Sequence, residues 1–351
     1  MKSPLSKEKS RKIMPNERTH QFLDLTADEL KAGLIENAYR KDDESRRWFS
    51  RFKFAYDAVN GNPHSALRQG IDLLNKCRTL DEDAYKEIHK GGAFYWLGIA
   101  SFLVNEYEMA VFFFDAAVSE DIRWGDKPNS PNPSPAMLFM QLAGEHPRQN
   151  GKKLTELAEA GIKRWTENYN SLSGVSSIPM STQILRERLL IPSLEPNHST
   201  WRSIATTFIS FSLEWDYRNL LLDIRIEPGT FEPFYIHLFK GCLLFESLLK
   251  ENPTKKPPPE QNSLHKVLEY LHKELGVKPN FDFNNKQWAD VLNELENSRD
   301  SIEQSILLTG MVRNTIGHNI GWKDGVTKIQ YQKLFMMVAS SCLHVIACLY
   351  K

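Results

Sequence analysis

The chain has 351 residues, which is enough for two domains of ordinary size. Lysine and arginine together number 44, aspartate and glutamate also number 44, and the formal net charge is therefore zero. This balance argues against a strongly basic domain that binds nucleic acid over a broad surface, but it leaves room for a local cleft with a few well-placed cations.

The sequence carries no readable targeting, membrane or metal signal. The N-terminus is polar and rich in lysine, without the apolar centre of a signal peptide, and no uninterrupted apolar run reaches about 18 residues. The cysteines form no close CxxC pair and predict neither a zinc site nor a disulfide framework. We therefore expect a cytoplasmic protein without a membrane span, a metal or a cofactor. The cysteines are Cys77, Cys242, Cys342 and Cys348.

The first part of the chain changes from polar to helical in pattern. Residues 1–27 are mostly charged and polar, which favours a flexible tail over a nucleic-acid-binding arm. Residues 26–29, Thr-Ala-Asp-Glu, have the pattern of a capping box, which marks the start of a helix. Helical patterns follow at about 45–59 and 64–77, and the Asn-Gly-Asn-Pro sequence at 60–63 separates them.

Residues 91–121 form the clearest unit of the N-terminal half. Large apolar residues alternate with the small residues Gly98 and Ala110, which would let two antiparallel helices approach closely around a turn near 105–107. Further helical patterns cover 136–143 and 152–169, after a proline-rich loop. We therefore predict a helical array over residues 28–170.

The spacing within this unit resembles a tetratricopeptide repeat (TPR), although Ser101 and Ile122 depart from that family's preferences. The resemblance implies a TPR-like domain with a concave surface for a protein or peptide partner. Structural support for the rest of the chain is an equally good interpretation of these helices.

The C-terminal half is predicted to be a helical bundle over residues 200–351. Residues 171–199 are loop-like apart from a possible short helix at 182–190, so they are predicted to be a linker. Apolar helical patterns then follow at 201–226, 234–250, 263–275, 286–295, from about 300 onward, and at 328–350. The last of these is apolar almost all round, which predicts burial. Strand-like alternation is scarce, and the fold class is therefore predicted to be all-α.

The helix that begins near residue 300 ends in the sequence Arg-Asn-Thr-Ile-Gly-His, residues 313–318. Asn314 and His318 are four positions apart and share a helix face, whereas Arg313 lies about 140° around the axis from His318. Gly317 and Gly321 weaken the helix here. We therefore expect the helix to end near His318 and to leave the imidazole at a surface or an interface.

These three side chains suit phosphodiester chemistry. Histidine accepts and returns a proton near neutral pH, the arginine fork matches phosphate oxygens, and asparagine can orient either one. RNA carries its own nucleophile, the 2′-hydroxyl, so a base and a fixed cation are sufficient for cleavage without a metal. The spacing alone is more typical of a surface arginine–histidine pair or of a satisfied interior group.

The Arg-x4-His pattern, at a helix end and before a final apolar helix, resembles the motif of the HEPN family over residues 201–351. The resemblance implies a metal-independent endoribonuclease with catalytic Arg313, Asn314 and His318, and a cleft completed by a second copy of the chain. It also implies a toxin or antiviral defence effector that is regulated through the N-terminal domain. Some HEPN domains only bind, so a non-catalytic scaffold protein is the alternative.

Glu246 and three histidines outside the motif also have predicted environments. Glu246 lies inside the apolar stripe of the helix at 234–250, and a carboxylate there needs a partner. Either it pairs with a nearby lysine or lies at the edge of the stripe, or it approaches Arg313. His344, within the last apolar helix, is expected to be a core histidine, whereas His265 and His272 are expected at the surface.

Overall fold

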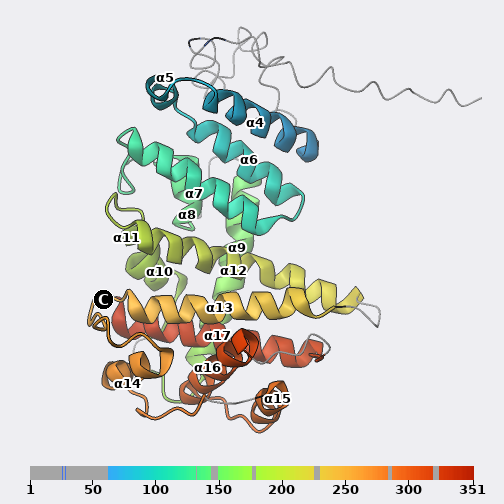
Figure 1. The fold of residues 1–351 in the computed structure, drawn as a ribbon, viewed down its shortest axis with the longest axis vertical. Coiled ribbons are helices and arrows are strands. Elements are labelled where there is room, and N and C mark those ends of the chain that lie inside the picture. Colours follow the sequence, from blue (N-terminus) through green and yellow to red (C-terminus); the bar gives the residue numbers. More distant parts are fainter. Residues whose placement is uncertain are drawn as a thin grey trace, which may run out of the picture.

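The computed structural model describes residues 26, 28, 62–131, 133–143, 149–175, 179–224, 230–283, 287–318 and 324–351. The described residues are mostly helical and include no strand (Figure 1), so the predicted all-α fold class is confirmed. The predicted tail at 1–27 and the predicted helix at 45–59 lie outside the described residues, apart from Thr26, and so does most of the predicted capping box.

The described N-terminal half is a stack of helices. It consists of α4 (Pro63–Arg78), α5 (Glu82–Glu87), α6 (Gly91–Leu103), α7 (Tyr107–Arg123), α8 (Pro135–Met140) and α9 (Gln149–Ser171). The predicted pair at 91–121 is confirmed as α6 and α7, with the turn at Asn105 in the left-handed region at φ 64°. A Cβ atom on Gly98 would lie 2.9 Å from the ring of Phe114, which explains the need for a small residue there.

The segment between the two halves is partly helical and anchors the helix that carries the motif. The predicted short helix at 182–190 is confirmed as α10 (Thr182–Leu185) and the π-helical turn η1 (Arg186–Leu190), and it continues into α11 (Ile191–Ser193). Before it, the backbone N–H of Ser173 donates to the carbonyl of Asp300 at 3.0 Å, and the N–H of Ile302 donates to the carbonyl of Ser173 at 3.0 Å. This backbone pairing fixes where the motif helix begins.

The C-terminal half is a bundle in which α12, α13 and α17 run side by side across the molecule (Figure 1). Its helices are α12 (Ser199–Ile224), α13 (Glu232–Lys250), α14 (Leu264–Leu275), α15 (Trp288–Glu296), α16 (Ile302–His318) and α17 (Lys328–Leu349). Each predicted helix is present, with ends within a few residues of those expected. The motif helix α16 packs on α13, α15 and α17.

The last helix, α17, is buried as predicted. By length and composition it is apolar enough to cross a membrane, yet 78% of its most apolar window is buried among the other helices. Burial on all sides removes the need for a polar face, which explains the composition. The absence of a membrane span stays a prediction.

One hydrophobic core continues across residues 171–199 and includes side chains from both halves. Trp165 of α9 is buried, with ring centroids 5.9 Å from Phe208 and 5.8 Å from Phe211, both on α12. Its ring also lies 4.8 Å from that of Phe335 on α17. The helical array and the bundle therefore share apolar contacts through α12.

Two buried histidines are neutral core residues with satisfied ring nitrogens. His237 donates from Nε2 to the carbonyl of Phe211 at 3.0 Å and accepts at Nδ1 from the Tyr331 hydroxyl at 2.6 Å. Burial lowers the pKa of His237 from 6.5 to about 3. His344 donates to the carbonyl of Leu275 and accepts from the Tyr169 hydroxyl, so its predicted core position is confirmed.

Candidate active site

The motif helix α16 is held in place by close packing along its middle. A Cβ atom on Gly310 would lie 2.3 Å from the ring of Phe283, so only glycine fits without movement of that ring. One residue earlier, the buried hydroxyl of Thr309 lies 2.9 Å from that of Ser341 on α17. These contacts fix the rotation of α16 and therefore the directions in which the motif side chains leave it.

Arg313 and Asn314 are brought together by hydrogen bonds. The Arg313 Nη1 group donates to the Asn314 side-chain oxygen at 3.1 Å, and Asn314 Nδ2 donates to the carbonyl of Phe283 at 3.2 Å. The Phe283 backbone thus orients the amide, and the amide orients the guanidinium. Arg313 remains 27% exposed, so part of its fork faces solvent.

Glu246 satisfies both of the pairings considered for it. One carboxylate oxygen lies 3.1 Å from Arg313 Nε, and the other lies 2.6 Å from Lys250 Nζ, one turn further along α13. The carboxyl is 9% exposed, and it carries one negative charge against two positive ones. The three groups together therefore leave an excess positive charge at this surface.

His318 is the last described residue of α16 and is exposed, which confirms the predicted surface position of the imidazole, whereas the predicted helix end falls at residues outside the described part of the chain. It follows Arg313 by about 7.5 Å along the helix axis at 1.5 Å per residue. Within the described part of the chain, His318 makes no hydrogen bond with Arg313 or Asn314. The structure therefore brings the arginine and the asparagine together and places the histidine on the same surface end of the helix, separate from them.

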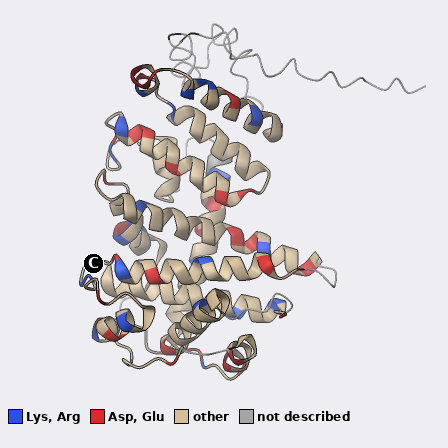
Figure 2. Ribbon diagram, viewed as in Figure 1, with Lys and Arg blue, Asp and Glu red and all other residues tan. Residues whose placement is uncertain are grey.

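Charges around this site are mixed rather than of one sign. Figure 2 shows basic and acidic residues interspersed over the helices, in keeping with the zero net charge. Among the described residues, no group of three or more histidine, cysteine, aspartate or glutamate side chains is arranged to hold a metal ion. The four cysteines are buried and unpaired, and burial raises the pKa of the Cys242 thiol, so it is uncharged.

Comparison with known proteins gives no relative from which a function could be carried over. No family model matches this chain. No curated protein and no solved structure matches it either.

Two residues that build the site were not identified from the sequence. Lys250 stands four positions after Glu246, the spacing of a helical ion pair, and that spacing could have identified it. The carbonyl of Phe283 gives no such signal, because a backbone acceptor in a loop is independent of residue type.

Proposed function

We propose that this chain is a metal-independent endoribonuclease of the HEPN type. One observation carries the proposal: Arg313 and Asn314 are joined by a hydrogen bond near the end of α16, and the exposed His318 follows about one turn later. An anchored guanidinium and an accessible imidazole at the same end of one helix supply a fixed positive charge and a proton-transfer group, which are the two requirements for metal-independent cleavage of RNA.

In the proposed reaction the 2′-oxygen of RNA attacks the adjacent phosphorus, and His318 accepts the proton of the 2′-hydroxyl. The bond from phosphorus to the 5′-oxygen breaks, and that oxygen leaves with a proton from the corresponding histidine of a second copy. The products are a 2′,3′-cyclic phosphate and a 5′-hydroxyl. Arg313 stabilises the charge that develops on the phosphate oxygens, and Asn314 keeps the guanidinium in position.

Self-association through the C-terminal bundle is part of this proposal. Exposed aliphatic side chains lie on the last described turn of α12 and on the first turn of α17, including Ile224 at 64% exposure and Ile329 at 67%. An exposed ion pair between Lys328 and Asp223 shows that these two turns are neighbours. An apolar surface of this kind suits contact with a second copy, and a twofold axis there would bring two copies of α16 toward each other.

The resemblances extend the proposal to the whole chain. The TPR-like domain, residues 28–170, binds a protein or peptide partner that regulates the HEPN-like domain, residues 200–351. The setting is a cytoplasmic toxin or antiviral defence effector. No membrane, metal or cofactor takes part.

A cleavage assay tests this function. Purified protein is incubated with a mixed RNA pool in the presence of EDTA, and the wild-type chain is expected to cleave it. His318→Ala is expected to abolish cleavage while the helical content measured by circular dichroism stays unchanged. His64→Ala removes another exposed histidine, on α4, and is expected to cleave like the wild type. Full cleavage by His318→Ala would contradict the proposed mechanism.

A non-catalytic scaffold is the second candidate function, and one observation favours it. The guanidinium of Arg313 is held by Glu246, a largely buried carboxylate of its own bundle, which is the arrangement of a structural ion pair. A scaffold would leave RNA intact in the assay above, with or without His318.

A further inference from the structure

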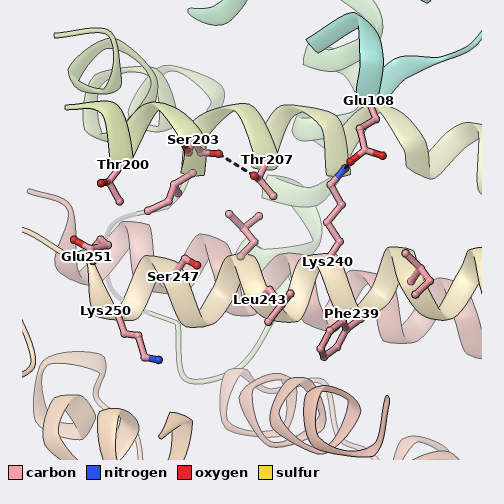
Figure 3. A pocket seen from close by; sticks show the side chains of 13 residues that line it. Glu108, Thr200, Ser203, Thr207, Phe239, Lys240, Leu243, Ser247, Lys250 and Glu251 are labelled. Carbon is pink, nitrogen blue, oxygen red and sulfur yellow. Dashed lines mark hydrogen bonds and ion pairs between the residues drawn. The ribbon is translucent and has the colours of Figure 1, made fainter. Parts of the chain in front are cut away.

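A groove lies between α12 and α13, with α7 at one end (Figure 3), and has a volume of about 590 Å³. Phe239 and Leu243 of α13 line one wall, and hydroxyl groups of α12 line the other. Ser203 and Thr207 donate their hydroxyl protons to backbone carbonyls of their own helix. Their oxygen lone pairs remain able to accept hydrogen bonds from a ligand in the groove.

The charged residues at the groove are paired in a way that favours an anionic ligand at one end. Lys240 is bound by Glu214 at 2.6 Å and by Glu108 at 3.1 Å, and Arg218 also pairs with Glu214, so the charges of this group balance. Glu251 is bound by Lys256 at 2.9 Å, so that pair is neutral too. Lys250 differs, because the one carboxylate that pairs with it among the described residues, Glu246, is shared with Arg313. The excess positive charge of this group therefore lies at the rim of the groove, where the Lys250 side chain projects from α13 on the side away from α12 (Figure 3).

The groove also adjoins the other end of the motif. Phe239, which lines the groove, lies close to the end of α16, since a Cβ atom on Gly317 would lie 3.6 Å from its ring. Gly317 directly precedes His318. Along α13 the groove wall extends from Ile236 to Lys250, about 21 Å at 1.5 Å per residue. On α13, Phe239 therefore lies between the groove and the end of α16 that carries His318. Lys250 connects the groove to Arg313 through their shared partner Glu246.

We propose that this groove holds a single-stranded segment of the RNA substrate, which deepens the ribonuclease proposal and rests on it. Phe239 stacks on the base beside the scissile bond, and Lys250 binds a phosphate. The hydroxyl oxygens of Ser203 and Thr207 accept hydrogen bonds from 2′-hydroxyl or base N–H groups. The groove length matches the smallest sites of single-strand-binding domains, about four nucleotides.

A binding experiment tests the groove without any need for cleavage. A labelled single-stranded RNA of mixed sequence is titrated with full-length protein that carries His318→Ala, and fluorescence anisotropy is followed at several salt concentrations. Lys250→Gln removes one phosphate contact, so the slope of log affinity against log salt is expected to become shallower by about 0.7. Phe239→Leu keeps apolar volume but removes the stacking surface, so affinity is expected to fall by about 5-fold or more with the slope unchanged.

Lys152→Gln is the matched control, because Lys152 also pairs with a glutamate four positions away and lies on α9, which does not line the groove. It is expected to change neither affinity nor slope. The groove proposal fails if Lys250→Gln and Phe239→Leu bind RNA like the parent protein. It also fails if either variant changes the oligomeric state while affinity per protomer stays the same, since the groove would then be a contact between copies.

The two proposals fail separately. RNA binding that depends on Lys250 and Phe239, together with a wild-type chain that cleaves nothing, would support the groove and refute the nuclease. Cleavage that depends on His318, together with groove variants that bind and cleave normally, would support the nuclease and refute the groove.

Discussion

Two glycines on the same helix are expected to respond in opposite directions to the same substitution. A Cβ atom on Gly310 would meet the ring of Phe283 at 2.3 Å, whereas one on Gly317 would meet Phe239 at 3.6 Å, an ordinary van der Waals distance. Replacement of glycine by alanine within a helix contributes up to about 1 kcal/mol of stability through backbone entropy. The sign of each result therefore depends on the space available.

At Gly310 the new methyl group must displace the aromatic ring, and insertion of a methyl group into a packed core costs roughly 1–3 kcal/mol. The contact is short enough to place this cost at the upper end, so Gly310→Ala is expected to be net destabilising by about 1–2 kcal/mol. Gly317→Ala has no such cost and is expected to stabilise by about 0.5 kcal/mol, a reduced gain because the position is close to the helix end.

Urea unfolding of the two variants and the wild type, followed by circular dichroism, measures both effects from the midpoints at a common slope. The expected order of stability is Gly317→Ala above wild type above Gly310→Ala. A Gly310→Ala variant as stable as the wild type would show that Phe283 moves away at no cost. That result would refute the conclusion that this contact fixes α16.

The remaining predictions concern the core. Because the pKa of His237 falls from 6.5 to about 3 on folding, the unfolded chain binds more protons between these values, and stability rises with pH across that window. Acidification from neutral pH to pH 4.5 is expected to cost about 3 kcal/mol of unfolding free energy through this residue. His237→Gln does not titrate, so urea unfolding at neutral pH and at pH 4.5 should show a smaller loss of stability for this variant than for the wild type. An equal loss in both proteins would contradict the neutral, buried state of His237. Trp165→Ala is expected to destabilise by about 3–5 kcal/mol. Because Trp165 of the wild-type chain contacts both α12 and α17, calorimetry of the wild type should show one unfolding transition. A separate early transition of the N-terminal helices would contradict the shared core.

Sequence periodicity predicted the described helices well because most of them expose one face and bury another. The close approach of two helices at Gly98 and the turn at Asn105 could be predicted because these positions require small or turn-forming residues. The network around Arg313 was harder to predict, since it depends on the Phe283 carbonyl and on how α13 is rotated against α16. Lys255, in the segment between α13 and α14, is held by Glu274 at 2.9 Å and lies over the ring of Tyr270, and these contacts likewise depend on how the helices pack.

The indole of Trp165 has a practical consequence for attempts to express the C-terminal part alone. A fragment that begins at residue 200 would retain Phe208, Phe211 and Phe335 but would lose the ring that covers them. That fragment would expose a hydrophobic aromatic surface to water and would tend to aggregate. A truncation that starts ahead of α9 keeps the cover in place and is the sounder choice for isolating the motif.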